Sequence, residues 1–175
     1  MSGHNKWSKI KNQKAVTDAQ KSKLFTKAVR LLTVEAKKAH GDMNAPGLVT
    51  AITKAREVNM PNDNIERAVK KASSDPASMD AITYEAYGPG GCAMVIETLT
   101  DNRNKAAQEV KHILSLHGTE LAGMGAATWA FEKTHEGWIP KTTVTLGDED
   151  GAKLGELVDA LEENDEVQAV YTNAE

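Results

Sequence analysis

Hydrophobic residues in the first half of the chain recur with the period of an α-helix. The longest such stretch covers residues 17–39 and is followed by Gly41, a residue type that commonly ends helices. One face of this helix carries Phe25, Ala28, Val29, Leu32, Ala36 and Ala39. The opposite face carries Lys23, Lys27, Arg30 and Lys37. We therefore expect the apolar face to be buried and the basic face to be exposed.

Two shorter stretches with the same period follow, at residues 45–58 and 62–72. Pro46 is tolerated in the first turn of a helix, and Met60-Pro61 separates the two stretches. The outer side of the second stretch carries Arg67, Lys70 and Lys71. Three helices that share a small core are predicted for this half of the chain.

After a linker-like segment at residues 73–78, the pattern changes to strands alternating with helices. Strands are expected at 84–87, 92–99, 128–133, 139–146 and 167–172, with helices starting at Asp101 or Asn102 and at Asp148. The order β-α-β-β-α-β is typical of a ferredoxin-like sandwich, in which two helices cover one face of an antiparallel sheet. We therefore predict an α+β fold with a basic three-helix domain at residues 1–76 and an acidic ferredoxin-like domain at residues 77–175.

Charge is strongly segregated along the chain. Residues 1–79 contain 15 Lys/Arg and 7 Asp/Glu, whereas residues 80–175 contain 6 and 18. The net charge of −4 for the whole chain conceals this asymmetry. Residues 1–30 alone hold eight basic residues, opposed only by Asp18. A basic segment carried on an acidic body favours binding to a polyanion such as nucleic acid.

The candidate nucleic-acid-binding residues form a basic arm that continues onto the first helix. They are His4, Lys6, Trp7, Lys9, Lys11, Lys14, Lys21, Lys23, Lys27 and Arg30. Lysine predominates over arginine, which favours contacts with phosphates over reading of base edges. Trp7 could stack on an unpaired base. The alternative is a solvated lysine face, with Trp7 packed on the helical core.

Other motifs point to local structure. Gly88-Pro89-Gly90-Gly91 lacks the Lys-Ser/Thr of a P-loop and opens no helix, so a tight turn is expected. His112 and His117 are five positions apart on one helix, which is poor metal geometry, and Cys92 lies in an apolar strand. Arg103, at a strand-to-helix junction, could reach a phosphate or a partner. With no nucleophile–base pair or carboxylate dyad, we expect no enzymatic activity, cofactor, metal site or small-molecule substrate.

The apolar runs, the N-terminal segment and the cysteine content favour one cellular compartment. No apolar run approaches the ~20 residues of a membrane span. The N-terminus lacks the apolar core of a secretory signal, and one cysteine cannot form an internal disulfide. We expect a cytoplasmic protein whose partner is DNA, or RNA on the ribosome, and not a membrane. The sequence makes no prediction of the oligomeric state.

Several motifs together resemble the YebC/PmpR family. They are Gly3-His4-Asn5-Lys6-Trp7, Lys23-Leu24-Phe25-Thr26-Lys27, residues 59–68, residues 84–91, Leu99-Thr100-Asp101-Asn102-Arg103-Asn104, Trp129-Ala130-Phe131-Glu132-Lys133 and residues 139–144. The resemblance covers nearly the whole chain. Members of the family are mostly described as DNA-binding transcriptional regulators, and others as translation factors, including mitochondrial activators. The resemblance implies no enzymatic activity.

This chain departs from the family pattern in one main respect. Members usually carry a third small domain inserted between the equivalents of residues 131–133 and 139–141, where only residues 134–138 connect the strands here. That length suits a hairpin loop. The family also commonly places His and Arg where this chain has Asn12 and Gln13.

The function predicted is a nucleic-acid-binding regulator of gene expression. The main interpretation is a DNA-binding transcriptional regulator that uses the basic arm and first helix. The alternative is a ribosome-associated translation factor that contacts ribosomal RNA. A third interpretation is a protein-interaction module whose sheet edge recruits a partner by strand pairing.

Overall fold

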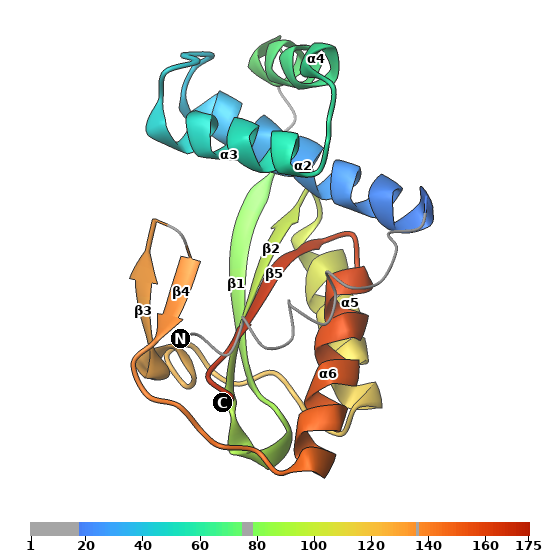
Figure 1. Ribbon diagram of the computed structural model, residues 1–175, viewed down its shortest axis with the longest axis vertical. Helices are drawn as coiled ribbons and strands as arrows, with labels where there is room; N and C mark the ends of the chain where they lie inside the picture. Colours follow the sequence, from blue (N-terminus) through green and yellow to red (C-terminus); the bar gives the residue numbers. More distant parts are fainter. Residues whose placement is uncertain (1–17, 75–78, 136) are drawn as a thin grey trace. The chain divides into compact units, whose positions relative to one another are not determined.

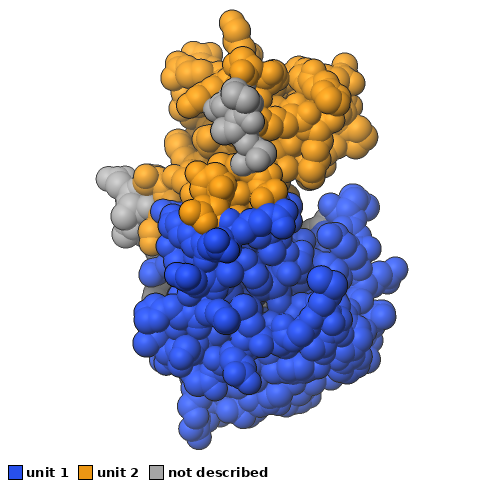
Figure 2. All heavy atoms as spheres, turned by 180° about the vertical axis from the view of Figure 1, so that it is seen from behind, with its two compact units in different colours: residues 1–15, 81–98, 103–175 blue, residues 16–80, 99–102 orange. Residues whose placement is uncertain are grey.

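The computed structural model describes residues 18–74, 79–135 and 137–175, with side chains from residue 21 onward. The chain forms two compact units (Figure 2). One, here called the helical unit, consists of residues 16–80 with 99–102, and the other, the sheet unit, contains residues 81–98 and 103–175. The predicted domain boundary at 76/77 lies outside the described residues.

The helical unit contains α2 (Asp18–Lys38), α3 (Pro46–Glu57) and α4 (Asn62–Ser74), as predicted (Figure 1). α2 packs against both other helices. Buried residues at helical spacing form the shared core: Ala28, Leu32, Ala36, Leu48, Ala51, Ile52, Ala55, Ile65, Val69 and Ala72. Many of these core residues are alanines, whose small side chains allow the three helices to pack closely.

Both connections in the helical unit use left-handed backbone. Gly41 has φ +82° and donates its N–H to the carbonyl of Ala36 at 3.0 Å, which closes α2 as expected. Asn59 has φ +60°, and the next N–H, of Met60, reaches the carbonyl of Ala55 at 3.0 Å. Asn tolerates this conformation better than most residues. The chain then turns at Pro61 into α4.

The sheet unit is built on three strands in the order β1 (Asp80–Tyr87), β2 (Ala93–Thr100) and β5 (Val167–Thr172). β2 and β5 are antiparallel. On one face, Met94 and Ile96 of β2 pack with α5 (Arg103–Leu116) and α6 (Asp148–Glu163), through a core completed by Val110, Leu114, Leu154, Leu157 and Leu161 (Figure 1). The alternate residues Ala93 and Val95 pack on the other face. Burial on both faces explains the nearly continuous apolar sequence of β2.

The second face of this sheet is covered by a separate ribbon. After η2 (Thr128–Ala130), β3 (Phe131–Thr134) pairs antiparallel with β4 (Gly137–Pro140) in a two-stranded sheet. Phe131 and Trp138 join the cluster of Ala93 and Val95, so the ribbon packs on the face of the main sheet. The α+β class and the element order are confirmed.

Three details of the predicted sheet are wrong. The ribbon does not extend the main sheet, the segment expected to be a strand from 128 begins as a short 3₁₀ helix, and the strand from 139 ends at Pro140. Proline lacks the N–H that a continuing ladder needs. Further along, Val144 makes only an isolated parallel bridge with Ala174. The β3–β4 ribbon is therefore held to the main sheet by side-chain packing, where the sequence pattern suggested strand pairing.

A buried carboxylate organises the loop that leads into the ribbon. Glu85 of β1 is 6% exposed and accepts the backbone N–H groups of Gly125, Ala127 and Thr128 at 2.7, 2.7 and 2.9 Å. Burial raises the pKa of this carboxyl group, but the hydrogen bonds outweigh burial and the pKa lies below its ordinary value. Glu85 thus holds, as an anion, a loop some 40 residues away in sequence.

Candidate nucleic-acid interface

The predicted interface lies partly within the described residues. His4, Lys6, Trp7, Lys9, Lys11 and Lys14 fall outside them, so their roles stay predictions. The other candidates, Lys21, Lys23, Lys27 and Arg30, lie on the first half of α2. Helical spacing places Lys23, Lys27 and Arg30 on one side of α2, as the sequence predicts.

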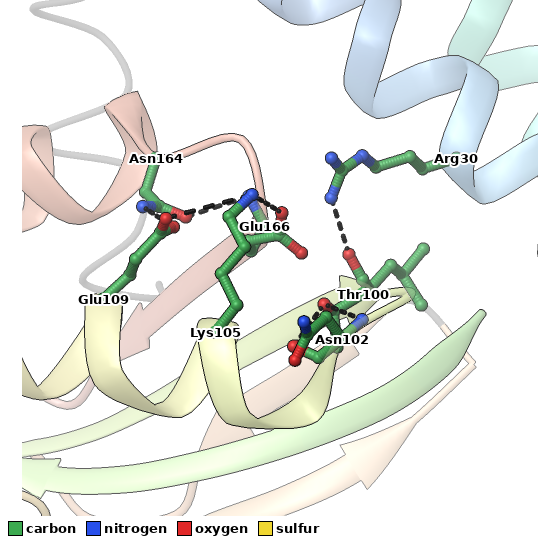
Figure 3. A network of polar contacts seen from close by, with 8 residues as sticks. Arg30, Thr100, Asn102, Lys105, Glu109, Asn164 and Glu166 are labelled. Atoms are coloured by element: carbon green, nitrogen blue, oxygen red, sulfur yellow. Dashed lines mark hydrogen bonds and ion pairs between the residues drawn. The ribbon is translucent and has the colours of Figure 1, made fainter.

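This side of α2 is only partly open to solvent. Lys21 is exposed, but Lys23, Lys27 and Arg30 are each half-buried. Arg30 donates from Nη1 to the carbonyl of Leu99 at 2.9 Å, within the helical unit (Figure 3). Lys21 and Lys27 also have intramolecular partners. These cations are therefore held by contacts within the protein, whereas an exposed basic face was expected.

The apolar side of α2 also departs from the simple helical pattern. Val29, expected in the core, is 39% exposed, and Leu24 is 41% exposed. Val34, on the basic side, is 7% exposed. The fully formed core begins only at Ala28, so the first turns of α2 keep apolar surface accessible beside their lysines.

A groove of about 680 Å³ runs along this part of α2. The described residues that line it are Lys21, Ser22, Phe25, Thr26, Val29 and Arg30. The hydroxyl of Thr26 donates to the carbonyl of Ser22 at 3.1 Å. The groove thus combines an apolar surface with a cation near each end. Such a surface can accommodate a flat apolar group that carries an anion, as a nucleotide does.

The helical unit also exposes cations that the candidate set omitted. They are Lys38 on α2, Lys54 and Arg56 on α3, and Arg67, Lys70 and Lys71 on α4. Their signal in the sequence is helical spacing opposite an apolar face.

The junction between β2 and α5 is organised locally. The hydroxyl of Thr100 accepts the N–H of Asn102 at 2.9 Å, just before α5 begins at Arg103 (Figure 3). In the sheet unit, Lys105 at the start of α5 pairs with buried Glu166 at 3.0 Å and lies 3.9 Å from Glu109. Arg103 is exposed and has intramolecular interactions. The basic residues at this junction therefore serve the fold.

Three other features considered in the sequence lie within the described residues. They contain no group of three His, Cys, Asp or Glu side chains arranged to hold a metal ion. Burial raises the pKa of the Cys92 thiol to about 11. Pro89–Gly91 forms the predicted turn between β1 and β2. Among residues 18–74, 79–135 and 137–175, no helix is long and apolar enough to cross a membrane.

Models of known families match almost the entire chain. The TACO1/YebC protein N-terminal domain matches residues 5–75. The TACO1/YebC second and third domain matches residues 79–136 and 133–174. The first match covers the basic arm and helical unit, and the second covers the sheet unit.

Individual relatives agree with this assignment. A "probable transcriptional regulatory protein" of Pseudothermotoga lettingae is 37% identical over 238 aligned positions, covering 100% of this chain and 94% of the relative. A protein of the same description from Petrotoga mobilis is 47% identical, over 85% of this chain and 61% of its own length. The crystal structure of a conserved hypothetical protein from Aquifex aeolicus has a TM-score of 0.79 at 30% identity, covering 90% of this chain and 91% of that one.

The comparisons also locate the departure from the family pattern. The alignment with the Pseudothermotoga protein has 238 positions although this chain has 175 residues, so the relative contains residues that are absent here. The second family model matches in two segments, residues 79–136 and 133–174, which overlap near the end of β3 and the start of β4. The protein therefore belongs to the TACO1/YebC family, and it lacks residues that the Pseudothermotoga relative carries.

Proposed function

We propose that this protein is a nucleic-acid-binding regulator of gene expression, acting as a DNA-binding transcriptional regulator through its basic arm and the first half of α2. The observation that carries the proposal is the charge segregation: 15 basic against 7 acidic residues before position 80, and 6 against 18 after it. The names of the curated relatives as probable transcriptional regulatory proteins support the same role. Electrostatic attraction to phosphates is the physical basis of the binding.

The residues of the candidate interface favour recognition of the sugar–phosphate backbone. Lysines are point charges that neutralise phosphates without reading the bases, and only Arg30 among the candidates offers a planar guanidinium. Its contact with Leu99 further restricts that group. We therefore expect weak sequence preference. If about five lysines contact phosphates, the logarithm of affinity should fall with the logarithm of salt at a slope of about −4 to −5.

The test is titration of a fluorescent 20-base-pair DNA duplex with the full-length protein at several salt concentrations. Replacing Lys6, Lys9, Lys11 and Lys14 by Gln should weaken binding and flatten the slope by about three to four units. The control replaces Lys111 and Lys141 by Gln, two exposed lysines of the sheet unit. It should leave the slope unchanged. If the variant lacking the four arm lysines had the same salt slope as wild type, the arm would not be the DNA-binding surface.

Crosslinking in living cells, followed by sequencing of the attached nucleic acid, tests the physiological target. Reads concentrated at promoters would support the transcriptional regulator. Reads concentrated in ribosomal RNA would replace it with the alternative, a ribosome-associated translation factor. An interaction module would differ from both, because neutralising the arm would leave its activity intact.

A further inference from the structure

The outer face of α4 carries three neighbouring cations. The inner side of the helix is buried through Ile65 and Val69, at 2% and 6% exposure. Arg67, Lys70 and Lys71 are all exposed. Residues three and four apart on a helix have Cβ atoms about 5–6 Å apart, so the three charges lie within one turn. Like charges at this spacing repel, and an external anion would relieve the repulsion.

The protein itself does not neutralise this face. Asp63 and Glu66 lie one turn before Arg67 and Lys70, yet none of the three cations forms an ion pair with any described residue. Some cations of the sheet unit, by contrast, do have partners. There, Lys105 pairs with Glu166 at 3.0 Å, Lys153 pairs with Glu149 at 2.7 Å, and Lys133 lies 5.1 Å from the Trp138 ring centroid. The α4 face, defined as Arg67, Lys70 and Lys71, is thus available to an outside anion.

This face is distinct from the predicted interface on α2. A Cβ atom built on Gly41 would lie 3.2 Å from Oγ of Ser73, so the end of α4 meets the turn that follows α2. Lys23 lies fifteen residues before Lys38, the last residue of α2. At about 1.5 Å per residue this is roughly 22 Å along the helix, and Arg30, eight residues before Lys38, is roughly 12 Å from it along the helix. Substitutions on the two surfaces can therefore be made and measured separately.

We propose that the α4 face is a second phosphate-contacting surface, which binds the sugar–phosphate backbone of the same nucleic acid as the arm and α2. The proposal rests on the proposed function and enlarges its footprint. The ligand chemistry is the phosphodiester backbone, which DNA and RNA share.

The experiment compares full-length protein with a variant carrying Arg67→Gln, Lys70→Gln and Lys71→Gln, using a 20-base-pair DNA duplex and a ribosomal RNA hairpin as probes. The matched control carries Lys111→Gln, Lys141→Gln and Lys153→Gln, which removes the same charge from the sheet unit. Three lost contacts should flatten the salt slope on duplex DNA by about 2.7 and raise the Kd at least tenfold near ~150 mM salt. The control should match wild type.

Each outcome decides the proposal. Weakening on either probe with an unchanged control supports it, and the probe that responds identifies DNA or RNA as the source of the phosphates. Wild-type Kd and slope for the α4 variant on both probes would overturn this inference while leaving the proposed function intact. Equal weakening by the control would overturn it too, because the effect would then reflect net charge. Failure of wild-type protein to bind either probe would overturn both proposals.

Discussion

Glu85 allows a quantitative test of the sheet unit. Its Oε1 accepts the N–H of Gly125, and its Oε2 accepts those of Ala127 and Thr128. In Glu85→Gln the remaining carbonyl oxygen can keep two of these bonds in neutral form, while the amide NH₂ faces the third donor. Hydrogen bonds to charged groups contribute about 1.5–3 kcal/mol each, and a buried unsatisfied donor costs about 1–3 kcal/mol. We expect the free energy of unfolding to fall by about 3 kcal/mol.

Urea unfolding measures this change, with Trp129 and Trp138 as fluorescence reporters within the sheet unit in a Trp7→Phe background. With an m value of about 2 kcal/mol/M, the midpoint should fall by about 1.5 M. Hydrogen exchange at Gly125 should accelerate in parallel. Glu132→Gln, an exposed residue of β3, is the control and should change stability by less than about 0.5 kcal/mol. A Glu85→Gln midpoint equal to that of the control would refute the role assigned to the carboxylate.

The difference in unfolding free energy between wild type and Glu85→Gln should depend on pH with a definite sign. Because the pKa of Glu85 is lowered in the folded protein, its anion stabilises the fold fully above the ordinary value of 4.5. This contribution is lost as the pH falls through the folded pKa. The stability difference between wild type and Glu85→Gln should therefore be largest near neutrality and shrink below pH 4.5. A difference that stays constant, or grows, into acid would contradict the hydrogen-bonding argument.

Three further predictions concern the fold. Gly90 has φ +68°, and an added Cβ would lie 2.5 Å from Cδ2 of Leu146, the tip of a partly buried side chain. Gly90→Ala should therefore lower the free energy of unfolding by about 1 kcal/mol more than Gly91→Ala, whose φ is +76° but whose Cβ meets nothing within 4 Å. Equal losses in urea would show that Leu146 moves aside at no cost. Burial raises the pKa of Cys92 from 9.0 to about 11, so at pH 8 its thiol should be alkylated about 100-fold more slowly than that of an unfolded peptide. Mass spectrometry measures the rate, and fast labelling of the folded protein would contradict the burial of Cys92. Leu157→Ala, at a fully buried position, should cost about 2–5 kcal/mol by tryptophan-detected unfolding, and a loss below 1 kcal/mol would mean that the core repacks.

The sequence predicts elements well where the signal is local. Gly41 ends α2 and Pro61 precedes α4 because left-handed glycine and proline act on their own few residues. The run at 92–99 becomes the central strand because its residues are apolar on both faces. The family resemblance, carried by motifs spread over the whole chain, is confirmed on the same basis.

Features that depend on distant partners were not predictable in this way. The pattern at 128–146 indicates strands, but only packing of Phe131 and Trp138 on Val95 decides that they form a separate ribbon. Glu85 resembles any exposed strand glutamate until the loop at 122–128 closes over it. On α2, helical spacing correctly grouped the basic residues, but it could not show that Val29 stays exposed.

The β3–β4 turn has a practical consequence for engineering. Thr134 and Gly137 are paired across the ladder, so a segment that starts and ends there must have its own ends close together. The length of such a segment matters little for closure, because each doubling costs only about 0.6 kcal/mol. The hairpin is therefore a suitable insertion site. A fluorescent reporter, or the additional residues of a relative, could be inserted between β3 and β4 while Phe131 and Trp138 keep the ribbon packed on the main sheet.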